Sequence, residues 1–240
     1  MERSFVPAFG QRARVWVDGD ELIELLGRHM NLEARGLGFS YAAGKEVFRD
    51  IDFVMRAGEV SAVSGRSGVG KSTLLMCLAG VFDYRGQVLY GDELLPRSRS
   101  GRAAARLAHV GFVFQRGELL PDLSVIENVA LPLRLQGVEV SAAVRAAAGW
   151  LDRLGLAEVS GSYPGELSGG QAQRASVARA LAKEPAIVLA DEPTAFLDDE
   201  SREPVAAALL GAADRGACVV IASHDQRLRS TAVNMLDLVG

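Results

Sequence analysis

The chain has 240 residues, of which 49% are hydrophobic and 23% are charged, so it is apolar enough to fold around a large core and is not a disordered polypeptide. Its formal net charge of -4 and its isoelectric point near 5.5 argue against a protein that binds a nucleic-acid backbone, because such proteins normally carry a basic face. We therefore expect no nucleic-acid partner.

The two cysteines and the apolar segments indicate a chain that stays in the cytoplasm. Cys77 and Cys218 each lie within an apolar run, where a cysteine most often acts as a small buried residue, so we expect both in the core and in a reducing compartment. No apolar run reaches the roughly 20 residues that a membrane-spanning helix needs. The first 30 residues also lack the continuous apolar segment of a secretory signal.

The first elements in chain order are strands that lead to a glycine-rich loop. Residues 32–41 and 46–59 alternate apolar and polar side chains, which indicates strands with one solvated face. Residues 60–65 read as a short buried strand that ends at glycine, and residues 71–81 have the apolar spacing of a helix. The sequence thus predicts a strand, a glycine-rich loop and a helix in direct succession.

The remaining chain reads as a helical insert followed by alternating helices and strands. Residues 84–96 are rich in turn-forming residues, and the basic, alanine-rich residues 97–115 end in a strand. From residue 117 to 161 the composition is helical, with an apolar face over residues 144–154. The elements expected after it are helices over residues 171–183 and 202–213 and strands over residues 186–190, 217–223 and 234–239. This alternation predicts an α/β fold.

The loop GRSGVGKST has the composition and position of a phosphate-binding loop. The spacing Gly65-x4-Gly70-Lys71-Ser72 lets backbone N–H groups converge on phosphate oxygens at a helix N-terminus. Lys71 would reach the β- and γ-phosphates, and Ser72 would hold Mg²⁺. A glycine-rich turn without a ligand is the alternative, which the flanking strand and helix disfavour. The predicted nucleotide-binding residues are Gly65, Arg66, Ser67, Gly68, Val69, Gly70, Lys71, Ser72 and Thr73.

Two acidic residues follow the apolar run of the segment AIVLADEP. Asp191 comes at the carboxyl end of a predicted buried strand, where open α/β sheets bind their ligands, and its carboxylate can hold Mg²⁺. Glu192 follows directly and is a candidate to orient or deprotonate the attacking water. Two solvated turn residues are the alternative interpretation, which the phosphate-binding loop in the same chain makes less favourable.

The stretch LSGGQ predicts a second helix N-terminus that carries glycines. A single nucleotide does not need two such phosphate-binding ends from the same chain. Together with the two phosphate motifs this stretch makes the sequence resemble the ATP-binding cassette (ABC) ATPases over nearly all of residues 32–240. In that family this signature closes over the nucleotide held by a partner subunit. The resemblance therefore implies that Ser168, Gly169, Gly170 and Gln171 contact the nucleotide of a second copy.

The resemblance also assigns roles to residues that carry little information alone. It implies that Tyr41 stacks on adenine, that Gln115 contacts Mg²⁺ or the attacking water, and that His224 touches the γ-phosphate. Asp198 fits the dimer-contact loop, although Phe196 stands where the family usually has a smaller residue. His29 and His109 are expected to have no such role.

The segment QRGELLPDLSVIENVALPL resembles the macrolide-export, lipoprotein-release and cell-division branch of the family, with a departure at residues 116–118. The implied architecture is an α/β P-loop NTPase core with an antiparallel β arm and an inserted α-helical subdomain at about residues 116–165. Residues 31–240 would form this ATPase domain. Residues 1–30 would be an extension that activity does not require, with a small helix over residues 20–28, because Met30 resembles a natural start.

The implied function is that of the ATPase subunit of an ABC transporter. It would use ATP and Mg²⁺, pair with a second copy, and drive a separate membrane-spanning permease chain from the cytoplasmic face of the membrane, with the helical subdomain as the docking surface. One alternative is a non-transport ABC ATPase that regulates a cell-wall or cell-division complex. Another is a phosphate-loop kinase, which does not account for LSGGQ.

Overall fold

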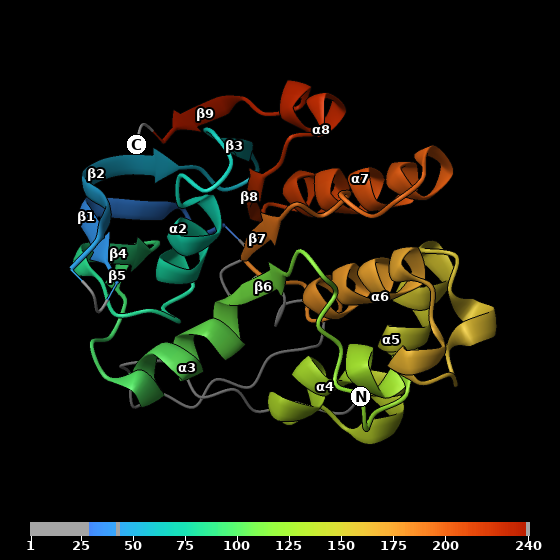
Figure 1. The fold of residues 1–240 in the computed structure, drawn as a ribbon. Helices are drawn as coiled ribbons and strands as arrows, with labels where there is room; N and C mark the ends of the chain where they lie inside the picture. Colours follow the sequence, from blue (N-terminus) through green and yellow to red (C-terminus); the bar gives the residue numbers. More distant parts are fainter. Residues whose placement is uncertain (1–28, 42–43, 239–240) are drawn as a thin grey trace.

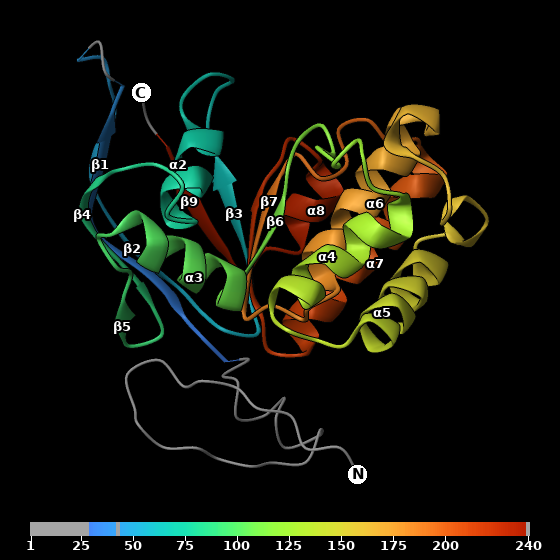
Figure 2. The same ribbon diagram turned by 90° about the horizontal axis from the view of Figure 1, so that it is seen from below.

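The computed structural model in Figure 1 describes residues 29–41 and 44–238, and the helix predicted over residues 20–28 lies outside them. The described residues form an antiparallel sheet with strand order β2-β1-β4-β5 and a parallel sheet with strand order β6-β7-β8-β3-β9. Helices pack on both faces of the parallel sheet, and α4, α5 and α6 gather at one side of the molecule (Figures 1 and 2). This is the predicted α/β fold with an antiparallel arm.

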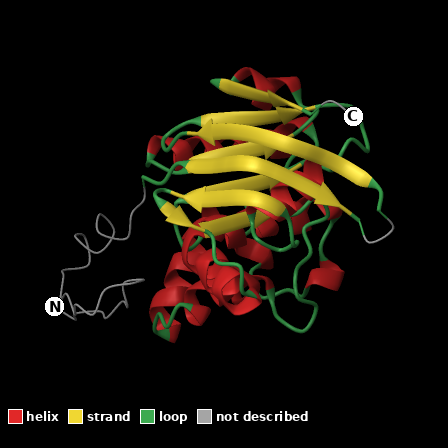
Figure 3. Ribbon diagram, turned by 90° about the vertical axis from the view of Figure 1, so that its left-hand side faces the viewer, coloured by secondary structure: helices red, strands yellow, loops and turns green. Residues whose placement is uncertain are grey.

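The antiparallel sheet, seen face-on in Figure 3, contains one strand pair that the sequence did not reveal. Its strands are β1 (Leu32–Ser40), β2 (Glu46–Met55), β4 (Arg85–Tyr90) and β5 (Glu93–Leu94). The turn-rich interpretation of residues 84–96 was wrong, because most of this segment forms strands and Gly86, one of its two glycines, lies where two strands approach closely. A Cβ on Gly86 would lie 2.2 Å from the carbonyl oxygen of Gly36 on β1.

The parallel sheet separates two hydrophobic clusters. Its strands are β3 (Val60–Ser64), β6 (Val110–Val113), β7 (Ile187–Asp191), β8 (Cys218–Ala222) and β9 (Asn234–Asp237). Along β7, Ile187 and Leu189 pack toward α2 and the antiparallel sheet, whereas Val188 and Ala190 pack toward the helices on the other side. Burial on both faces explains why these strands are apolar without alternation.

The helices complete the two clusters. α2 (Lys71–Leu78) and α3 (Arg99–His109) lie on the side of the antiparallel sheet, and α6 (Gly169–Leu181) and α7 (Asp199–Asp214) lie on the other side. α4 (Val125–Leu135) and α5 (Val140–Arg153) pack against α6 and, with two short 3-10 turns, form the predicted helical insert. α8 (Gln226–Ser230) precedes β9. None of these helices, within residues 29–41 and 44–238, is both long and apolar enough to cross a bilayer.

The first described residues already contact the body of the fold. A Cβ on Gly216 would lie 2.4 Å from the His29 ring, so the imidazole packs directly over that glycine. Met30 packs against the cluster that includes β1 and β4. Both cysteines are free and fully buried, as predicted.

Candidate nucleotide-binding site

The glycine-rich loop runs from the end of β3 to the first residue of α2, where the sequence predicted it. Gly70 has φ +112°, and a Cβ there would lie 2.4 Å from Val47 Cγ1. Gly65 has φ +143°, and its Cβ would lie 2.8 Å from the carbonyl oxygen of Leu238. Any other residue at these two positions would clash and would strain the backbone, so the shape of the loop depends on glycine.

Lys71 is folded over the loop that precedes it. Its ammonium group donates to the carbonyl oxygens of Gly65 (3.0 Å) and Arg66 (3.4 Å), and it lies 3.4 Å from Nε2 of His224. Only 8% of the residue is exposed. These contacts hold a cation at the centre of the loop, next to the N-terminus of α2, where an anionic phosphate is favoured.

Asp191, Ser72 and Gln115 bring oxygen donors together beside this cation. Asp191 is the last residue of β7 and is 6% exposed. Burial raises the pKa of Asp191, while a hydrogen bond from Ser72 acts in the opposite direction. One carboxylate with a hydroxyl and an amide oxygen suits Mg²⁺, which usually takes one or two carboxylates and completes its shell with phosphates and water. The predicted metal residues therefore fit the ion chemically.

Glu192 has an unusual backbone and is tied to the loop after β8. Its φ is +45°, a left-handed conformation that is uncommon outside glycine, and its N–H donates to Ala222 (2.7 Å). Its Oε2 accepts from the N–H of His224 (3.2 Å) and from the hydroxyl of Ser223 (3.3 Å). The predicted base and the predicted γ-phosphate contact are thus adjacent, with Oε1 3.7 Å from Nε2 of His224.

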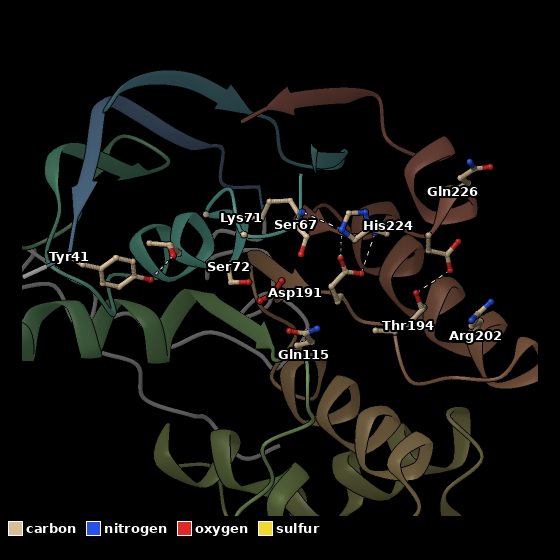
Figure 4. A pocket seen from close by; sticks show the side chains of 16 residues that line it. Tyr41, Ser67, Lys71, Ser72, Gln115, Asp191, Thr194, Arg202, His224 and Gln226 are labelled. Carbon is tan, nitrogen blue, oxygen red and sulfur yellow. Dashed lines mark hydrogen bonds and ion pairs between the residues drawn. The ribbon is translucent and has the colours of Figure 1, made fainter. Parts of the chain in front are cut away.

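These groups line one pocket of about 800 Å³, shown in Figure 4. The structure brings eleven predicted residues into its wall: Tyr41, Ser67, Gly68, Gly70, Lys71, Ser72, Thr73, Gln115, Asp191, Glu192 and His224. The wall also contains residues that the sequence reasoning missed, namely Thr194, Ala195, Arg202, Asp225 and Gln226. Thr194 and Ala195 follow Glu192 closely in the sequence, and Asp225 and Gln226 follow His224, so their proximity to predicted site residues could have indicated them. Nothing in the sequence around Arg202 indicated a place in the pocket.

Tyr41 lies at the edge of this pocket with part of its ring free. It is 48% exposed, and its ring meets Phe39 edge-on at a centroid distance of 4.9 Å. Its hydroxyl is 2.9 Å from Oγ1 of Thr73, so the predicted adenine contact is hydrogen-bonded to a residue of α2, the helix that follows the glycine-rich loop (Figure 4).

The signature residues do not belong to this pocket. Ser168 is the N-cap of α6, and its hydroxyl accepts from the N–H of Gln171 (3.2 Å) while the Gln171 side chain accepts from the Ser168 N–H (2.9 Å). Ser168 and Gly169 are exposed. Gly170 lies near the backbone carbonyl of Phe196, a residue that is itself 52% exposed. The chain therefore presents a capped helix N-terminus on its surface, apart from Lys71.

The comparison with known proteins places the chain in a family. The model of the ABC transporter family matches residues 48–195. The chain belongs to the ABC transporter family. The lipoprotein-releasing system ATP-binding protein LolD of Roseobacter denitrificans is 42% identical over 205 residues, which are 82% of this chain and 90% of that protein.

Two further comparisons extend this family assignment. The macrolide export ATP-binding/permease protein MacB of Shigella flexneri is 40% identical over 213 residues, which are 86% of this chain but only 33% of that protein. A solved dimeric bacterial ABC transporter cassette matches with a TM-score of 0.80 and 29% identity, covering 86% of this chain and 94% of that one.

Membership in the ABC transporter family confirms the family resemblance, and the LolD and MacB relatives match the predicted lipoprotein-release and macrolide-export branch. The cassette is an ATP-binding and ATP-hydrolysing subunit of a transporter. The alternative of a regulator of a cell-wall or cell-division complex is not favoured by relatives named for release and export.

Proposed function

We propose that two copies of the cassette associate head to tail and enclose ATP and Mg²⁺ between the Lys71 loop of one copy and the Ser168 helix end of the other. The observation that carries this proposal is the separation of the two motifs within one chain: Lys71, Asp191 and Glu192 share a pocket, while Ser168 and Gly169 are exposed outside it. A second copy would complete the site. The similarity to a cassette solved as a dimer supports this arrangement.

In the proposed site each side chain has a distinct task. Lys71 holds the β- and γ-phosphates, and Ser72, Asp191 and Gln115 hold Mg²⁺, which neutralises charge on the phosphates when it is bound. Glu192 takes the proton of the water that attacks the γ-phosphorus, so that phosphate is formed and ADP leaves. His224, at 3.4 Å from the Lys71 ammonium, contacts the γ-phosphate. Tyr41 offers its exposed ring to adenine.

We also propose that the cassette drives a separate membrane-spanning chain from the cytoplasmic face of the membrane. The name of MacB joins an ATP-binding part to a permease, whereas LolD, which this chain matches over 90% of its length, is named as the ATP-binding protein of a releasing system; this supports a permease on another polypeptide. Affinity purification of the tagged cassette from membranes, with identification of the bound chains, tests this. Recovery without any membrane-spanning chain would contradict it.

A pair of variants tests the two-chain site. Glu192→Gln keeps the shape of the side chain but removes the base, so we expect ATP to bind and hold two copies together while hydrolysis falls by about 10²- to 10⁴-fold. Ser168→Arg should leave ATP bound to monomers, because the larger and positively charged side chain would prevent the two copies from closing over the nucleotide. Sedimentation with and without Mg-ATP distinguishes these states.

Mixing the two inactive variants provides the decisive measurement. A mixed dimer has one site with both changes and one site with neither, so ATP hydrolysis should return. A kinase or a single-chain ATPase predicts no such recovery. If the mixture stays inactive and Glu192→Gln remains monomeric in Mg-ATP, even with the membrane partner present, the two-chain site is wrong.

A further inference from the structure

The backbone turn that carries Gln115 determines where its amide lies in the pocket. The turn follows β6 and is closed by a hydrogen bond from the N–H of Gly117 to the carbonyl oxygen of Phe114 (3.3 Å). Gln115 occupies a central position of this turn and lines the nucleotide pocket. Glu118, with φ +40°, continues the irregular backbone, and its N–H donates to the carbonyl oxygen of Arg116 (2.9 Å).

Two side chains of α6 hold the backbone on both sides of Gln115. The Gln173 amide donates to the carbonyl oxygen of Phe114 (3.1 Å). The Arg179 guanidinium donates to the carbonyl oxygens of Glu118 (2.9 Å) and Gly117 (3.2 Å). Gln173 is 1% exposed, so its contact is shielded from water. The turn is therefore fixed at its first, its last and its following residue by one helix.

The turn also lies directly on the backbone of α6. A Cβ on Gly117 would lie 3.0 Å from the carbonyl oxygen of Ala172, and its φ of +76° favours glycine as well. Figure 1 shows the segment after β6 passing beside α6. Because the contacts use the backbone of residues 114–118, the family departure at residues 116–118 is compatible with them.

We propose that Gln173 and Arg179 are positioning residues that set the place of Gln115 in the nucleotide pocket. This inference rests on the proposed function, in which Gln115 acts on Mg²⁺ or on the attacking water. The same helix begins with the signature residues that would contact the nucleotide of the other copy.

Arg179→Met tests the proposal because it keeps the aliphatic stem and removes both donors. We expect kcat of ATP hydrolysis to fall by about 5- to 50-fold, because a small misplacement of a catalytic group can cost up to about 10²-fold. The KM for ATP should stay within about twofold, since the loss concerns a step after binding. Arg179→Lys, which keeps a cationic donor, should recover part of the rate.

A double-mutant cycle with Gln115→Ala separates positioning from general support of the fold. Without the Gln115 amide, Arg179→Met should change kcat by less than about twofold. Arg174→Met is the matched control, because this arginine of the same helix donates to Leu154 (2.9 Å) and not to the turn. Its effect should be the same with and without Gln115. Gln173→Met, which is close in size, provides a second cycle if Arg179→Met does not fold.

The outcomes distinguish this inference from the proposed function. If Arg179→Met and Gln173→Met lower kcat by the same factor in both backgrounds, they act through the fold, and the positioning role is wrong while the nucleotide site stands. If Gln115→Ala keeps the full rate, the role of Gln115 in the proposed function is wrong, and the inference fails with it.

Discussion

The Thr194 hydroxyl donates a hydrogen bond of 3.0 Å to Oδ2 of Asp225 and so joins the loop after β7 to the loop after β8. Thr194 is only 2% exposed. The same loops are joined a second time, because Ser223 donates to Glu192 (3.3 Å) and accepts from the N–H of Asp225 (3.1 Å). The loop that carries Glu192, the predicted base, and the loop that carries His224, the predicted γ-phosphate contact, are thus connected within a single chain.

Thr194→Val should loosen this connection while it preserves the shape of the side chain. We expect ATP turnover to fall by about 3- to 30-fold with little change in ATP affinity, because the carboxylate of Glu192 is placed less accurately. Stability should fall by about 1 to 3 kcal/mol, since a partly buried hydrogen bond to a carboxylate is lost. Thr194→Ser keeps the hydroxyl and is the control. Steady-state rates equal to the original protein in Thr194→Val would contradict the role of the bond.

Lys71→Ala should weaken ATP binding without unfolding the chain. The lysine bonds to carbonyl oxygens of its own loop and not to the core, so the melting temperature should change little. Loss of a charge-assisted contact costs about 1.5 to 3 kcal/mol, which corresponds to an affinity loss of about 10- to 150-fold. Titration calorimetry with ATP and thermal unfolding measure the two effects. Near-normal ATP affinity in a folded Lys71→Ala would contradict the site.

Tyr41→Phe should bind ATP with an affinity within about threefold of the original protein, because the exposed ring that would stack on adenine is retained. The hydroxyl contacts Thr73 and is not needed for stacking. Tyr41→Ala removes the ring and should weaken binding by about 5- to 150-fold, since base–aromatic stacking is worth about 1 to 3 kcal/mol. Equal affinities of the Phe and Ala variants would exclude stacking at this position.

The free energy of unfolding should rise with pH between about 7 and 8 because of Lys183. Its amine donates to Arg106 (3.0 Å) and Leu107 at the end of α3, and burial together with the Arg106 charge lowers its pKa from 10.5 to about 7. In this window the unfolded chain binds more protons than the folded one, so raising the pH favours folding by up to about 1.4 kcal/mol per pH unit.

Urea unfolding at about pH 7.0, 7.5 and 8.0 measures this slope, and Lys183→Met is the control that should lack it. The window lies between the pH ranges in which three other groups change the stability most. Burial lowers the pKa of His109, which adds a slope in the same direction below pH 7, and burial raises the pKa of both cysteines to about 12, which acts in the opposite direction at higher pH. A flat profile in the original protein would contradict the role of Lys183.

The sequence predicted those features whose cause is local. The positive φ angles of Gly65 and Gly70 belong to the backbone of their own loop, and Asp191 follows its own apolar strand, so spacing and composition sufficed to find them, although not the approach of Leu238 and Val47 to the two glycines. Strand β4 escaped prediction because Gly86 reads as a turn residue, although it serves the approach of Gly36, about 50 residues earlier in the chain. The spacing of residues in the sequence does not reveal a contact between two segments that lie far apart in the chain.

The supporting contacts of the site could not be predicted for the same reason. The bonds of Gln173 and Arg179 to the Gln115 turn span about 60 residues, and the bond of Thr194 to Asp225 spans 31. Each depends on how two elements pack, and none of these residue types in its local sequence indicates a partner. A glutamine or arginine on a helix is most often solvated, and the signature motif gave no reason to look further along α6.

The two cysteines of the chain are fully buried, and burial raises the pKa of each thiol to about 12. Because the thiolate is the reactive species, neither should react readily with maleimides or with cross-linking reagents while the protein is folded. The two cysteines of the chain therefore need not be replaced before a reactive cysteine is introduced elsewhere for labelling. A cysteine placed at Phe196 or beside Ser168 would be the one that takes up a fluorophore or forms a cross-link, so the distance between two copies could be followed through a cycle of ATP binding and hydrolysis.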